Sequence, residues 1–86
     1  METDARARAR VLMELLAGDI QPIVGKSGPP VYAVRPDSLL FRVLDAVKEG
    51  EEKEVGSVDA YLFFKTTDAI HTALQHPGVL RALRHT

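Results

Sequence analysis

The sequence predicts an α+β fold, in which a small three-stranded sheet carries helices packed mainly on one face. Helical spacing of apolar residues alternates along the chain with short runs rich in β-branched and aromatic residues. The 86 residues are 45% hydrophobic and 27% charged, which is typical of one compact globular domain over residues 1–86. The expected order of elements is α-β-β-α-β-α-α.

The first helix is expected over residues 3–17, with Thr3 as its N-cap and Gly18 just past its end. At about 100° per residue, one broad arc of this helix holds most of its apolar side chains. We expect this arc to face the core, and it contains Ala5, Ala9, Val11, Leu12, Leu15 and Leu16.

A β-hairpin is expected next, from the β-favouring runs 20–24 and 31–35. The segment 25–30 between them contains two glycines and two prolines, which is typical of a turn. Because Pro22 has no amide hydrogen, its strand should lie at an edge of the sheet.

Asp37 or Ser38 is expected to cap a second helix that ends at Gly50. Its apolar face consists of Leu39, Leu40, Val43, Leu44 and Val47. Phe41 falls at the border of this face, and the charged residues 51–54 predict a solvated loop.

The third strand is expected within residues 55–65, and it contains the run Tyr61-Leu-Phe-Phe64. Alternation places Leu62 and Phe64 on one face, and Tyr61 and Phe63 on the other. If the helices cover only the first face, the second face keeps two aromatic side chains without a cover.

Two helices are expected to complete the chain. Thr66 or Thr67 caps the first of them, which runs to Gln75. Pro77 then occupies the first position of a short terminal helix. Its apolar side chains Val79, Leu80 and Leu83 should point inward.

Several kinds of chemistry have no support in the sequence. Without cysteine, the chain has no disulfide, thiolate metal site or thiol nucleophile. The triplet Gly25-Lys-Ser27 lacks the earlier glycine and the following helix of a phosphate-binding loop. His71, His76 and His85 do not share one helix face, so we expect no metal and no cofactor.

DNA binding is an alternative that the residues leave open, because the segment 66–75 could act as the recognition helix of a winged-helix-like regulator. The net charge is −1, however, and the nearest cations are Lys65, Arg81 and Arg84. These three side chains are the expected nucleic-acid contacts, and they predict only weak binding to phosphates.

The remaining expectation is a small non-enzymatic protein that acts through protein–protein contact, either as a homo-oligomeric adaptor or as a subunit of a larger assembly. Its interface should include the aromatic side chains Phe41, Tyr61 and Phe63.

Asp59 supports a third hypothesis, that the protein is an enzyme or a ligand sensor, because a buried carboxyl group can take part in acid–base chemistry. No run of apolar residues is long enough for a membrane span, so we expect no membrane partner and a cytoplasmic location.

Overall fold

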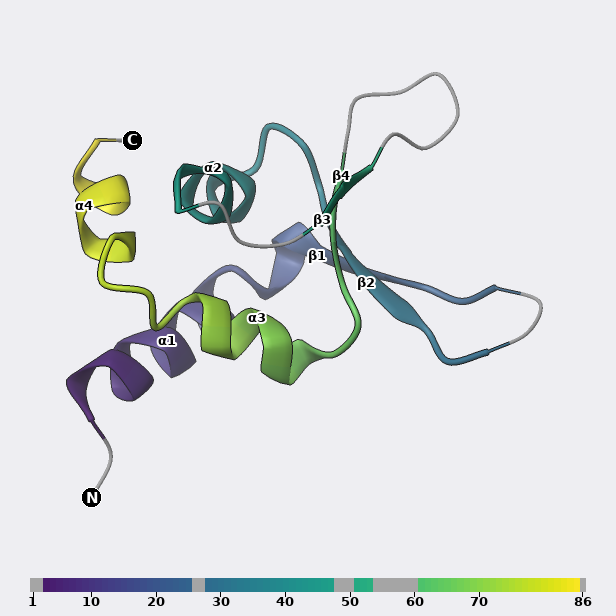
Figure 1. Ribbon diagram of the computed structural model, residues 1–86, viewed down its shortest axis with the longest axis horizontal. Helices are drawn as coiled ribbons and strands as arrows, with labels where there is room; N and C mark the ends of the chain where they lie inside the picture. The colour runs from purple at the N-terminus through teal and green to yellow at the C-terminus, as the bar shows by residue number, and fades with distance from the viewer. Residues whose placement is uncertain (1–2, 26–27, 48–50, 54–60, 86) are drawn as a thin grey trace.

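The computed structural model describes residues 3–25, 28–47, 51–53 and 61–85, and it confirms the predicted α+β class. Figure 1 shows helices gathered on one side of a sheet, with the β1–β2 hairpin extending away from them. The antiparallel strands lie in the order β1 (Ile20–Ile23), β2 (Val31–Val34), β4 (Tyr61–Phe64) and β3 (Glu51–Lys53). The helices are α1 (Asp4–Leu15), the short 3-10 helix η1 (Ala17–Asp19), α2 (Leu39–Ala46), α3 (Thr67–Ala73) and α4 (Val79–Arg84).

Hydroxyl side chains begin three of the helices, as the sequence predicts. Each hydroxyl oxygen accepts a hydrogen bond from the amide three residues later: Thr3 from Arg6 at 3.2 Å, Ser38 from Phe41 at 3.1 Å and Thr66 from Ala69 at 3.0 Å. Ser38 and Thr66 are therefore the caps, rather than their neighbours Asp37 and Thr67.

The last helix begins later than predicted. Pro77 is not its first residue but lies in a turn that is closed by the Val79 amide donating to the His76 carbonyl at 3.1 Å. The Nδ1 atom of His76 also accepts a hydrogen bond from the Gly78 amide at 2.9 Å. Proline at the second position of such a turn is favoured because its φ angle is already fixed near the required value.

The sheet has one strand more than the three predicted. Glu51–Lys53, expected as a loop, forms β3 and pairs with β4 in antiparallel register. Its acidic residues have low strand propensity, but the free edge of β4 offers backbone hydrogen bonds that outweigh this preference. Residues 55–60 of the predicted third strand lie outside the described part, and β4 accounts for the rest of it.

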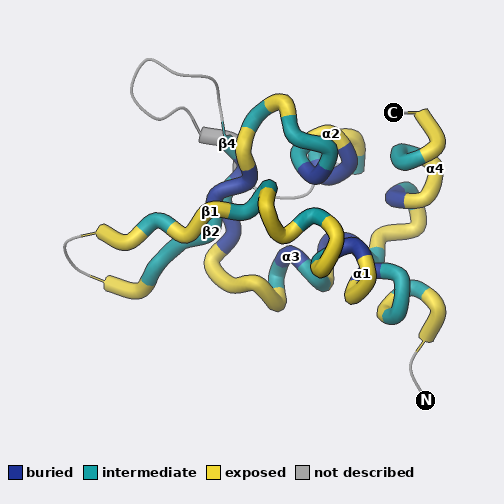
Figure 2. Tube along the Cα trace, turned by 180° about the vertical axis from the view of Figure 1, so that it is seen from behind, coloured by how far each residue is buried: buried dark blue, intermediate teal, exposed yellow. Residues whose placement is uncertain are grey.

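The core lies between the helices and one face of the sheet. Alternate strand residues point toward the helices, and among them Val34, Leu62 and Phe64 are buried. They pack with buried residues of α1 to α4 and with Leu74, the C-cap of α3; the helical residues are Ala9, Leu12, Leu40, Val43, Leu44, Ile70, Ala73 and Val79. Figure 2 shows burial concentrated where the helices meet the sheet, whereas much of the hairpin is exposed.

Three apolar residues that were predicted to point inward are exposed instead. The exposed fractions are 51% for Val11, 73% for Leu15 and 42% for Leu80. In α1, the side chains that meet the core are those of Ala9 and Leu12, with Met13 and Leu16 partly buried beside them. A helix buries only the stripe that faces its neighbours, and the predicted arc was wider than this stripe.

Candidate functional site

The face of the sheet that points away from the helices is the strongest candidate site. Cross-strand register places six described side chains on it: Gln21 and Ile23 of β1, Val31 and Ala33 of β2, and Tyr61 and Phe63 of β4. We call these six residues the outer sheet face. None of the six belongs to the cluster that the helices and the sheet bury between them. The Gln21 amide and the Tyr61 hydroxyl are the polar side-chain groups in this set.

Tyr61 and Phe63 form the aromatic part of the outer sheet face. Their ring centroids are 6.3 Å apart with an angle of 39° between the planes, and both side chains are half-buried. Ala33 lies directly across from Phe63 and is completely buried. Its methyl group is therefore already covered, and the aromatic surface that this face offers comes from the half-buried rings of Tyr61 and Phe63.

The third predicted interface residue lies elsewhere. Phe41 is on α2 and packs, half-buried, against the core cluster on the helix side of the sheet. Tyr61 and Phe63 point to the opposite side, because they alternate with the core residues Leu62 and Phe64. The structure therefore brings Tyr61 and Phe63 together and places Phe41 apart from them.

The cations that were predicted to contact nucleic acid do not form one surface. Lys65, Arg81 and Arg84 are all exposed. Lys65 lies between β4 and α3, whereas both arginines are on α4, which Figure 1 places at the other end of the helical layer. Asp59, the candidate acid or base, lies outside the described residues.

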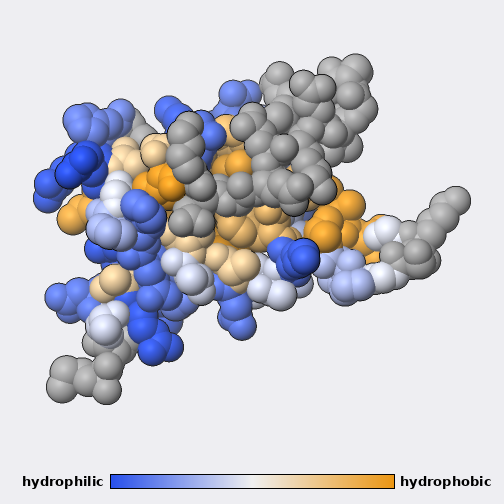
Figure 3. All heavy atoms as spheres, viewed as in Figure 1, coloured by the Kyte–Doolittle hydropathy of each residue, from blue (hydrophilic) through white to orange (hydrophobic). Residues whose placement is uncertain are grey.

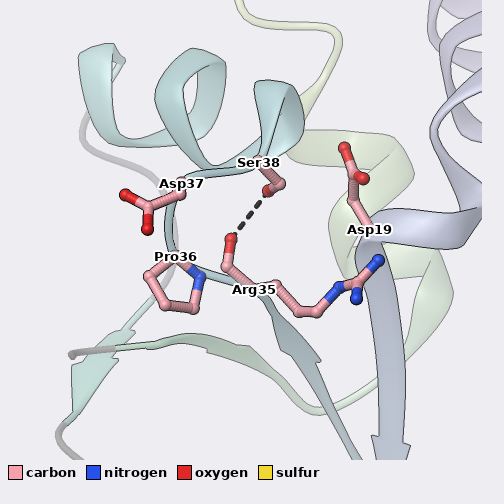
Figure 4. Close-up of a pocket in the computed structure, with 5 residues that line it drawn as sticks. All are labelled: Asp19, Arg35, Pro36, Asp37 and Ser38. Atoms are coloured by element: carbon pink, nitrogen blue, oxygen red, sulfur yellow. Dashed lines mark hydrogen bonds between the residues drawn. The ribbon is translucent and has the colours of Figure 1, made fainter. Parts of the chain in front are cut away.

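An open hollow of about 270 Å³ lies where the hairpin meets the start of α2, and it is lined by Asp19, Arg35, Pro36, Asp37 and Ser38 (Figure 4). The side chains of Asp19, Arg35 and Ser38 form hydrogen bonds with the nearby backbone. The Arg35 guanidinium donates to the Gly18 carbonyl at 2.8 Å, and the Ser38 hydroxyl donates to the Arg35 carbonyl at 2.7 Å. One carboxylate oxygen of Asp19 accepts from the Leu40 amide at 3.3 Å.

These bonds give the hollow a structural role. Asp19 and Ser38 accept from successive amides of the first turn of α2, where an external anion would otherwise bind. Asp37 adopts the left-handed conformation with φ of 68°, which turns the chain from Pro36 into the helix. Among the described residues, no three histidines or acids lie close enough to hold a metal ion.

The two caps of α2 lead to a prediction about stability. Replacing Ser38 or Asp19 with alanine should each lower the free energy of unfolding by about 1 kcal/mol, because an amide of the first helical turn loses its acceptor. Urea denaturation followed by circular dichroism measures this change. Thr72→Ala is the control, since Thr72 is exposed within α3 and should tolerate the change without loss. Equal stability of Ser38→Ala and wild type would contradict the assigned capping role.

Comparison with protein-family models, with curated proteins and with solved structures gave no match to this chain. Within the described residues, every helix is too short or too polar to cross a membrane.

Proposed function

We propose that this protein acts through protein–protein contact and not through catalysis, as a homo-oligomeric adaptor or as a subunit of a larger assembly. The contact surface is the outer sheet face, and Tyr61 and Phe63 are its aromatic side chains. The observation that carries the proposal is the mostly apolar composition of the outer sheet face, none of whose six residues belongs to the core cluster.

An antiparallel sheet with one free face usually alternates apolar side chains toward the core with polar side chains toward water. In this sheet the alternation is missing from β2 and β4. Val31 and Ala33 in β2, and Phe63 in β4, carry no polar group, although they point away from the helices. Figure 3 shows hydrophobic atoms reaching the surface along the hairpin, beyond the helical part of the molecule.

Aromatic side chains are well suited to such a contact. Tyrosine and phenylalanine are enriched at the centres of interfaces, because they bury a large area while few rotatable bonds become fixed. The Tyr61 hydroxyl offers a hydrogen bond at the border of the contact. The contact between the two rings also limits their freedom before a partner binds.

Phe63→Ser tests this proposal. If the chain self-associates through the outer sheet face, loss of the ring should weaken association by about 2 kcal/mol, or roughly 30-fold in the dissociation constant. Sedimentation equilibrium over a range of concentrations measures the change, and circular dichroism verifies the fold. Leu15→Ser is the matched control, because it removes an apolar side chain that is 73% exposed on α1, away from the sheet.

Two outcomes count against the proposal. Equal weakening by Phe63→Ser and Leu15→Ser would show that general hydrophobicity drives the association. A wild-type chain that stays monomeric would refute the homo-oligomer. In that case, a photo-crosslinking residue at position 63 tests for another subunit, and crosslinks no more frequent than those from position 15 would refute the assembly as well.

A further inference from the structure

The free edge of β1 is unusual in its hydrogen-bonding groups. The Arg35 amide donates to the Asp19 carbonyl at 3.1 Å, which identifies these two residues as a hydrogen-bonded cross-strand pair. Such pairs alternate along an antiparallel ladder, so Gln21 and Ile23 also direct their backbone groups toward β2. Ile20 and Pro22 direct theirs away from β2, toward the open edge.

Neither of these two residues offers a free amide hydrogen at that edge. The Ile20 amide already donates to the Ala17 carbonyl, in the last turn of η1. Pro22 has no amide hydrogen. All four residues of β1 are described, so this strand presents carbonyl acceptors to the open edge but no available donor.

The opposite edge of the sheet is short. β3 has three residues, and the pairs on either side of Glu52 direct their backbone groups toward β4. Only the Glu52 backbone is then left to face outward. Short and charged edge strands are a common protection against pairing with another chain.

We propose that Pro22 closes the β1 edge to strand addition, so that a second copy of this chain cannot pair with it. In an antiparallel pairing of two copies centred on residue 22, each residue would donate its amide to the other's carbonyl. Proline removes both of these hydrogen bonds. The neighbouring side chains Ile20 and Ile23 favour strand pairing, which makes the protection necessary at this edge.

The position of Pro22 in the sheet supports this role over a requirement for folding. Proline is tolerated in a strand only where its nitrogen faces away from the ladder, which is the case here. Pro22 and Gln21 are both exposed, and neither is part of the core cluster. Substitution at either position therefore leaves the helix-side packing intact.

Pro22→Thr compared with Gln21→Thr tests the proposal. Both variants place the same β-favouring side chain in the same strand, but only Pro22→Thr adds an outward amide. Both are made together with Phe63→Ser, so that association through the outer sheet face is weakened in each. Each backbone hydrogen bond that forms between the two copies should raise the association constant about fivefold, and Pro22→Thr allows two such bonds. Pro22→Thr should therefore self-associate roughly 25-fold more strongly than Gln21→Thr in sedimentation equilibrium.

Infrared spectroscopy gives a second measurement, because new strand pairing increases the β-sheet amide I absorbance as association proceeds. Pro22→Ala provides a second variant that restores the donor with a minimal side chain. If both proline variants associate no more strongly than Gln21→Thr, or if both lose the fold, the proposal is wrong. Because the Phe63→Ser background is shared, either failure leaves the proposed outer-face contact unaffected.

Discussion

Leu44→Ala is expected to lower the free energy of unfolding by about 2–5 kcal/mol. The Leu44 side chain is completely buried in the core cluster. It lies on α2, which packs against both β4 and α4, so surrounding elements hold its position from several sides. Removal of three carbon atoms leaves a cavity that these elements cannot close, and the lost packing adds to the lost burial of apolar surface.

Thermal and urea denaturation measure this change. For a chain of this size we expect the melting temperature to fall by roughly 10 °C or more. Leu15→Ala makes the same chemical change at a side chain that is 73% exposed, and it should stay within about 0.5 kcal/mol of wild type. If the two variants lost a similar free energy of unfolding, the assignment of Leu44 to the core and of Leu15 to the surface would be contradicted.

Ala9→Leu is expected to have the next largest effect, a loss of about 1–3 kcal/mol. Ala9 is completely buried on α1, and Ala73 is buried on α3, the helix that packs against α1. Small side chains on these faces let the two helices approach closely. A leucine at position 9 requires the helices to separate or neighbouring side chains to leave their preferred rotamers.

Ala46→Leu is the matched control, because Ala46 is exposed on α2 and has space for the larger side chain. Urea denaturation should show Ala9→Leu destabilised and Ala46→Leu unchanged or slightly more stable. An Ala9→Leu variant as stable as wild type would show that α1 and α3 have room between them. Such a result would contradict the close packing described here.

Local signals in the sequence predicted the starts of the helices well. Thr3, Ser38 and Thr66 each accept a hydrogen bond from the amide three residues later. The residues that determine where a helix begins are therefore close together in the sequence, within one helical turn. The exposed positions of Val11 and Leu15 were predicted wrongly, because the direction in which α1 faces depends on α3, far along the chain. β3 was missed for the same kind of reason, since its existence depends on the free edge of β4.

The candidate site was predictable only in part. Alternation along one strand predicted that Tyr61 and Phe63 share a face, and the ring contact between them confirms this placement. Which side of the sheet Phe41 lies on depends on how α2 packs against the sheet, and the sequence of α2 alone does not determine that packing. The capping role of Asp19 could not be predicted from local sequence, because the amide that it accepts from, that of Leu40, lies 21 residues later in the chain.

The packing of α1 against α3 has a consequence for the chain during its synthesis. The ribosome must add every residue from Leu16 to Thr66 after α1 is complete before α3 begins. At typical rates of elongation this interval is on the order of 3–10 s. Throughout it, Ala9 and Leu12 of the nascent chain lack the helix that packs against α1 in the folded protein.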